Sequence, residues 1–152
     1  MKQEYKNLLL KDLCARLPYN TIVQIKNSGI WNLKGVEQDK IDEIGYEVIV
    51  WHGKNYPSSK TSFPISICKP YLFPLSSMNE EDKFEFRKLT TDYDNKESMG
   101  NFMFRYEELL EELEMIGFFP YEIYDWLNAN HFDYRGLIKK GLALDATNLN
   151  IY

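Results

Sequence analysis

Residues 21–36 read TIVQIKNSGIWNLKGV, and the prediction of a sheet begins from this stretch. Its first six residues, Thr21 to Lys26, alternate in polarity and are rich in β-branched side chains, which is typical of a half-buried strand. Asn27-Ser28-Gly29 is a turn sequence. Residues 30–36 then return as the partner strand. The pattern therefore predicts a β hairpin.

Two further stretches extend this hairpin into a sheet. Residues 45–51, GYEVIVW, predict a third strand, and the turn at 52–55 follows it. Residues 61–68 predict a fourth strand, which Pro64 confines to an edge or a bulge. Residues 69–75, KPYLFPL, predict an extended apolar connector, because two prolines disfavour regular pairing. Four short strands joined by turns indicate a curved antiparallel sheet or a small barrel.

A helix is predicted before the sheet, over residues 3–16. Leucines recur at helical spacing, at Leu9, Leu10, Leu13 and Leu17. Pro18 ends the helix, because proline disfavours helical backbone in the residue before it. The charged side chains expected to face water are those of Lys6, Lys11 and Arg16.

The second half of the chain carries helical patterns. Ser77-Met78-Asn79-Glu80 fits a capping box that opens a helix to about Leu89, with Phe84 and Leu89 pointing inward. Residues 102–116 carry an apolar stripe at helical spacing, and Gly117 is suited to end that helix.

Two more helices are predicted nearer the end of the sequence. Pro120 opens the first of them. Its apolar face consists of Ile123, Trp126 and Leu127, and we expect this face to be buried. Asp133 is expected to cap a short helix through Lys140, closed by Gly141 and packed as part of the core.

These patterns predict an α+β fold. The chain has 152 residues, which is the size of one domain. Hydrophobic residues make up 44% and charged residues 27%, which excludes a wholly disordered chain. We therefore expect a single domain, 1–152. Its first part, 1–75, is a helix plus a four-stranded sheet or barrel, and 76–152 form a helical half.

The charge is unevenly distributed along the chain. The net charge is −5, so a basic nucleic-acid footprint is missing from the chain as a whole. Residues 1–75 carry ten Lys and Arg against seven Asp and Glu, whereas 76–152 carry eight against sixteen. The apolar run at 8–10 is too short for a signal peptide or a membrane span. These features predict a cytoplasmic protein that does not associate with membranes.

No motif in the sequence is typical of a particular enzyme reaction. The only soft metal ligands are Cys14, His52, Cys68 and His131, and their spacing matches no zinc site. No G-x-S-x-G elbow or phosphate-binding glycine run occurs. Cys14, between Leu13 and Ala15, is expected to be a buried structural thiol. The sequence therefore predicts no cofactor, no metal and no catalytic residue.

Two binding functions remain for comparison. Lysines alternate with aromatic residues in the β region, as in some nucleic-acid-binding barrels, but neighbouring acidic residues reduce the positive field. A protein interface fits better, because aromatic side chains are good anchors and charge asymmetry orients partners. The candidate protein-binding residues are Glu107, Glu108, Glu111 and Glu112, on one face of a predicted helix, with Trp31 and Tyr56.

Three segments of the chain carry a resemblance. They are residues 11–19, KDLCARLPY, residues 69–78, KPYLFPLSSM, and the tail with residues 131–138, HFDYRGLI, followed by 141–146, GLALDA. Together they resemble a family of small uncharacterised proteins encoded in gut Bacteroidales genomes, their phages and mobile elements. The resemblance implies an accessory protein and transfers no activity or catalytic residue. The functions considered are, in order, protein–protein binding without catalysis, nucleic-acid binding by a small barrel, and an enzyme activity. The partner is an unidentified protein, nucleic acid is not favoured, and the oligomeric state is open.

Both cysteines are predicted to remain thiols, because their spacing is not typical of a disulfide framework and the sequence shows no secretion signal. Thiol titration of the unfolded protein without reductant should detect two reactive groups per chain. A monomer with none would contradict the prediction.

Overall fold

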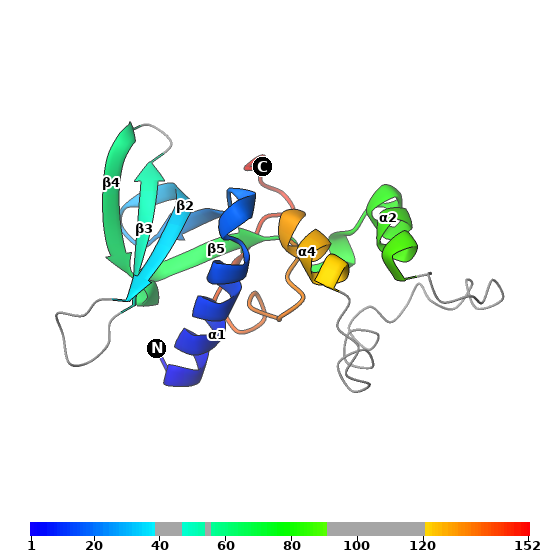
Figure 1. Ribbon diagram of the computed structural model, residues 1–152, viewed down its shortest axis with the longest axis horizontal. Coiled ribbons are helices and arrows are strands. Elements are labelled where there is room, and N and C mark those ends of the chain that lie inside the picture. The colour runs from blue at the N-terminus through cyan, green and yellow to red at the C-terminus, as the bar shows by residue number, and fades with distance from the viewer. Residues whose placement is uncertain (39–46, 54–55, 91–120) are drawn as a thin grey trace.

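The computed structural model describes residues 1–38, 47–53, 56–90 and 121–152. For 47–53, 56–60 and the single positions Gln38, Arg87 and Thr90, the description covers the backbone alone. The fold is α+β, with an N-terminal helix on a mixed sheet and two further helices beside it (Figure 1).

The sheet has the strand order β4-β3-β2-β1-β5-β6 and is not closed into a barrel. The strands are β1 (Ile22–Ile25), β2 (Gly29–Gln38), β3 (Glu47–Gly53), β4 (Tyr56–Pro64), β5 (Cys68–Leu72) and β6 (Leu144–Asp145). Neighbours are antiparallel, except that β6 lies parallel to β5. An α+β fold with an open sheet is thus confirmed, but the sheet is mixed and has six strands, not the four antiparallel strands predicted, because β5 and β6 extend it. The barrel alternative is wrong.

The predicted hairpin is confirmed as β1 and β2, which pair from Ile22 opposite Asn32 to Ile25 opposite Gly29. Its turn places Asn27 at φ 64° and Gly29 at φ 101°. Asn tolerates the left-handed region, and glycine adopts a φ of this kind without steric penalty. The turn residues therefore fix the hairpin locally.

The fourth strand and the connector differ from their predictions. Residues 61–68 are not one strand, because β4 ends at Pro64 and a 3-10 turn, η2 (Ile65–Ile67), leads into β5. The expected connector supplies most of β5. Lys26 N donates to Ile67 O, so the alternation of an antiparallel ladder puts Pro70 at a position that is not hydrogen-bonded to β1. The missing proline amide is therefore not needed by β1.

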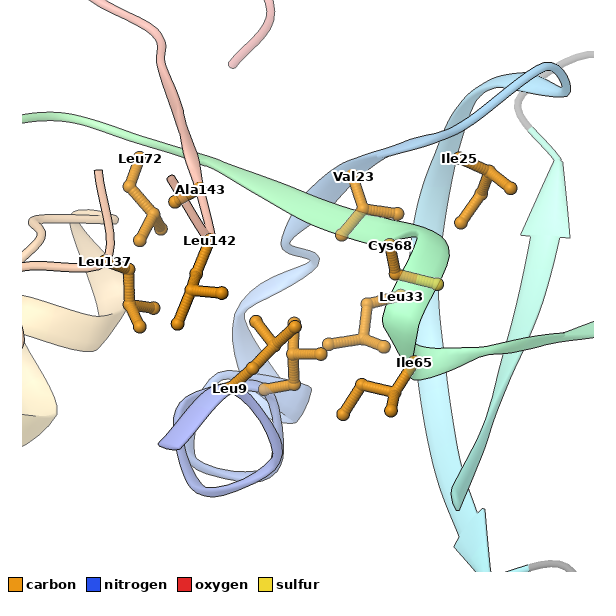
Figure 2. Close-up of a cluster of buried hydrophobic side chains, with 11 residues drawn as sticks. Leu9, Val23, Ile25, Leu33, Ile65, Cys68, Leu72, Leu137, Leu142 and Ala143 are labelled. Atoms are coloured by element: carbon orange, nitrogen blue, oxygen red, sulfur yellow. The ribbon is translucent and has the colours of Figure 1, made fainter. Parts of the chain in front are cut away.

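One face of the sheet packs on the N-terminal helix α1 (Gln3–Ala15), which confirms the predicted helix. Leu9 and Leu13 are fully buried against side chains from β1, β2 and β5 (Figure 2). The C-terminal tail, residues 130–152, closes the same cluster with Leu137, Leu142 and Ala143. The prediction that the tail belongs to the core is confirmed.

A second apolar cluster lies between α2 (Glu80–Thr90) and α4 (Tyr121–Ala129). Ile123 and Leu127 of α4 are buried there and Trp126 is half-buried, close to their predicted placement. From α2, however, Phe86 is buried, whereas Phe84, predicted inward, is 55% exposed.

The N-terminus of α2 explains the different helix face. Ser77 does not cap this helix: it ends a short 3-10 turn, η3 (Leu75–Ser77). Asn79 Oδ1 instead accepts from the amides of Glu81 and Asp82, and the Asp82 carboxylate accepts from Asn79 N. The capping box is therefore two residues later than predicted.

The tail does not contain the short helix predicted over 133–140. It is a series of turns there, in which Asp133 accepts from the amides of Leu137 and Ile138. These amides are four and five residues on, too far for a helix N-cap, which bonds two or three residues on. The predicted helix over 102–116 lies outside the described residues, so the helical second half is only partly seen.

Leu137→Ala should reduce the free energy of unfolding by about 2–5 kcal/mol, because it leaves a cavity in the apolar cluster that joins α1, the sheet and the tail. Leu149→Ala is the matched control, since Leu149 is 44% exposed, and a change within about 0.5 kcal/mol is expected. Urea unfolding followed by circular dichroism measures both. Equal stability of the two variants would show that the tail is an appendage.

Candidate functional site

A buried polar cluster joins the end of α1 to the tail. Arg16, predicted to face water, is fully buried instead. Its Nε donates to the Asp12 carboxylate over 2.8 Å, and its other guanidinium nitrogens donate to the carbonyls of Phe132 (2.7 Å) and Asn128 (3.4 Å). Burial is tolerated because each of these donors has a partner. Arg16 thus fastens α1 to a segment more than 100 residues away.

Asp12 is shared between two arginines. Its second carboxylate oxygen accepts from Arg135 over 2.8 Å, and Arg135 is itself only partly exposed. The Tyr134 ring lies near both guanidinium groups, 4.4 Å from Arg135 and 5.7 Å from Arg16. The Tyr134 hydroxyl donates to Asn128. We call Asp12, Arg16, Asn128, His131, Tyr134 and Arg135 the buried polar cluster.

His131 stands at the edge of this cluster in a left-handed backbone conformation, φ 59°. Its ring stacks on Tyr152 with centroids 3.8 Å apart, and its backbone carbonyl accepts from Phe73 N. The buried Nδ1 has no hydrogen-bond partner among the residues that the structure describes. Burial, and secondarily the positive charge of Arg16, lower the pKa of His131 from 6.5 to about 4. The ring is therefore neutral at pH 7.

A second contact between distant segments lies nearby, where η1 (Leu17–Tyr19) meets α4. The Tyr19 hydroxyl donates to the Asp125 carboxylate, and this bond raises the pKa of Tyr19 to about 12. Thr21 completes the corner by donating to the Arg16 carbonyl. The residues around the end of α1 thus connect three distant parts of the chain.

The chemistry of the buried polar cluster is that of a structural junction. Asp12 is neutralised by two arginines, and His131 hydrogen-bonds to no carboxylate that would orient it as a general base. Within the described ranges, no three His, Cys, Asp or Glu side chains come together as a metal site would require. The geometry is that of a junction which holds α1 and the tail together.

The two cysteines are thiols in different environments. Cys14, predicted buried, is exposed on α1, because Leu9 and Leu13 take the inner face of that helix. Cys68 is buried and its Sγ donates to the Pro64 carbonyl. Burial raises the pKa of Cys68 to about 12, so its thiol stays protonated and is a poor nucleophile.

Of the predicted protein-binding residues, the structure describes the side chain of Trp31 alone. Trp31 is half-buried: its ring meets Phe63 edge-on at 5.5 Å, and its Nε1 donates to Ser28 O across the hairpin turn. For Tyr56 only the backbone is described, as the first residue of β4. The acidic residues Glu107, Glu108, Glu111 and Glu112 lie outside the described residues.

The exposed outer face of α2 was missed by sequence reasoning. It consists of Glu81, Phe84, Glu85 and Lys88, spaced so that they follow one side of the helix, and all four are exposed. Lys88 lies over the Phe84 ring at 4.6 Å and pairs with Glu85 at 2.7 Å. The Asn79–Asp82 capping box is the sequence signal that would have placed Phe84 outside.

Comparisons with protein-family models, curated proteins and solved structures found no match. The part of the chain that the structure describes contains no helix long and apolar enough to cross a membrane.

Arg16→Met should destabilise the protein by about 3–5 kcal/mol, because it leaves the buried Asp12 with one arginine and removes the donor to Phe132 O. Lys88→Met is the control, since it breaks an exposed ion pair worth at most about 1 kcal/mol. Chemical denaturation of both variants tests this. A loss for Arg16→Met no larger than for Lys88→Met would contradict the structural role of the cluster.

Proposed function

We propose that the protein is a non-enzymatic accessory protein that acts by binding another protein. The observation that carries the proposal is the outer face of α2, where an exposed aromatic ring is surrounded by charged side chains. Aromatic residues are enriched at the centres of protein interfaces, and a charged rim around such a centre orients the partner. The α2 helix lies at one end of the molecule, remote from β4 (Figure 1).

The charge of this face favours a basic partner. Glu81 and Glu85 flank Phe84, and Glu80 at the start of the helix is also exposed. The exposed lysine, Lys88, is already paired with Glu85. The neighbouring helix α4 adds Glu122 and Asp125 and no basic residue, so the surrounding field has the same sign. The complementary surface is an apolar pocket with a basic rim.

The origin of the protein is proposed on the resemblance of its three segments. We propose that it is encoded by a phage or mobile element of gut Bacteroidales and acts in the cytoplasm of that host. The predicted acidic helix with Glu107, Glu108, Glu111 and Glu112, together with Tyr56, stays proposed as part of the interface.

The nucleic-acid alternative has less support. In the described part of the sheet, Trp31 and Phe63 pack on the α1 side, whereas Gln24, Ile30 and Lys69 belong to the opposite side by strand alternation and register. Tyr71 shares the side of Lys69 and hydrogen-bonds to Gln24, but it is buried. A buried ring cannot stack on a base while a neighbouring lysine binds the phosphate.

Phe84→Ser should weaken capture of the partner by at least about tenfold, because loss of a central anchor commonly removes 2 kcal/mol or more. The tagged protein would be used to capture proteins from a gut Bacteroidales lysate. A photo-crosslinking residue placed at position 84 would identify the band in direct contact. Ile30→Ser is the matched control, since Ile30 is a similarly exposed apolar residue on the β hairpin.

A second variant tests the charge of the outer face of α2. The double substitution Glu81→Lys, Glu85→Lys should slow association with the partner and reduce the salt dependence of the association rate. Capture that survives Phe84→Ser, or that Ile30→Ser reduces equally, would overturn the assigned face. Tight binding of single-stranded RNA or DNA at physiological salt would overturn the proposed function itself. So would a turnover that is lost on changing His52 or His131.

A further inference from the structure

The segment 144–152 is attached to the sheet by few interactions. Its two-residue strand β6 pairs with Tyr71 and Leu72, and Ala146 N donates to Leu72 O over 2.9 Å. The Tyr152 hydroxyl donates to the Tyr71 carbonyl over 2.7 Å and accepts from Ile22 N. In this position the segment covers one apolar cluster, which consists of Ile22, Tyr71 and Ala146 with Phe73, Leu144 and Ile151 beside it.

The last residue of this segment, Tyr152, packs on the ring of His131. The His131 ring lies nearly parallel to that of Tyr152, with an interplanar angle of 15°. The Phe73 ring contacts the same tyrosine, with ring centroids 5.8 Å apart. The His131 backbone is bound to β5 through Phe73, whose N donates to His131 O. Any change in the His131 ring therefore acts directly on the attachment of Tyr152.

The surroundings of His131 suit only the neutral ring. From α1, Arg16 presents a buried positive charge, and the carboxylate of Asp12 is already shared between Arg16 and Arg135. From the tail, Asp133 is occupied by two backbone amides. The α4 helix contributes the uncharged Asn128, and the tyrosines in contact with the region are Tyr71, Tyr134 and Tyr152. A second proton on His131 would find no free acceptor among these described groups.

We propose that His131 is an acid-sensitive latch, whose protonation releases the segment 144–152 from the sheet and uncovers the edge of β5 together with Ile22 and Tyr71. A charged imidazolium would be held beside the buried Arg16, with an unpartnered Nδ1 that must now donate. Swinging out with Tyr152 gives the ring access to water. Because the segment is held by β6 and one tyrosine, it opens without disruption of β1 and β2.

The direction of the pH effect follows from the lowered pKa. The closed form has a His131 pKa of about 4, and we take the ordinary value of 6.5 for the open form. The closed form is therefore fully favoured above pH 6.5, and this preference is lost progressively as the pH falls from 6.5 towards 4. Linkage with these two values raises the opening equilibrium constant by about twentyfold between pH 7 and pH 5.

Amide hydrogen exchange measured by NMR tests the latch. The Ala146 amide reports the segment, and the Leu33 amide, which donates to Thr21 O over 2.8 Å, reports the central sheet. After correction for intrinsic rates, the protection of Ala146 should fall about twentyfold from pH 7 to pH 5. At both pH values Ala146 should be less protected than Leu33, because the segment opens before the sheet does.

Two variants assign the effect to one histidine. His131→Asn should remove the pH dependence at Ala146, and Asn was chosen because it tolerates the left-handed backbone of this position. His52→Asn should retain the full pH dependence, and its single remaining imidazole signal gives the titration of His131 directly. This variant keeps the test decisive if His131→Asn fails to fold.

Three results would overturn the latch. One is a His131 ring that titrates at its ordinary pKa in the His52→Asn protein. Another is Ala146 protection that does not change with pH. The third is equal protection of Ala146 and Leu33, which would mean that the segment is released only by global unfolding.

Discussion

The Asp12 carboxylate lies between two guanidinium groups, and the connection between the beginning and the end of the described chain depends on it. Arg16 reaches Asp12 from one turn along α1, and Arg135 reaches it from the tail. Replacing this buried group by packed apolar side chains could be neutral for stability, since taking charges out of water is costly. We infer that its contribution is specificity, because an apolar contact would leave the tail free to slide along α1.

An arginine is the side chain that this junction requires. The planar fork of Arg16 donates to a carboxylate on its own helix and to two carbonyls in the segment 128–132. A lysine has one nitrogen and could not satisfy groups in these separate directions. The Phe132 and Asn128 carbonyls would then be buried without this donor. The guanidinium thus fixes the path of the chain as it leaves α4, and this path delivers Leu137 to the apolar cluster that contains Leu9 and Leu13 of α1.

The predictable parts of the fold are those decided by neighbouring residues. The β1–β2 hairpin follows from alternation and from a turn that accepts positive φ, and α1 follows from its leucine spacing. The spacing of Asp12 and Arg16 is that of an ordinary exposed helix pair, so only the tail shows that this pair is buried. Pro70 misled the prediction of a connector. Whether a strand tolerates a proline depends on whether its partner strand needs that amide, and the pairing with β1 is not visible in the local sequence. The site was missed for the same reason, since Arg16 and His131 come together only through the tertiary fold.

The two edges of the described sheet are protected from further strand pairing in different ways. At the β4 edge the strand itself contains Pro57, Lys60 and Pro64, residues that discourage pairing with another chain. At the other edge, β5 is covered only where β6 pairs with Tyr71 and Leu72. An edge that is blunted by its own sequence cannot be opened, whereas an edge covered by a short segment can. Sensitivity to protonation at His131 therefore lies at the edge where a small structural change has the largest effect on exposed backbone.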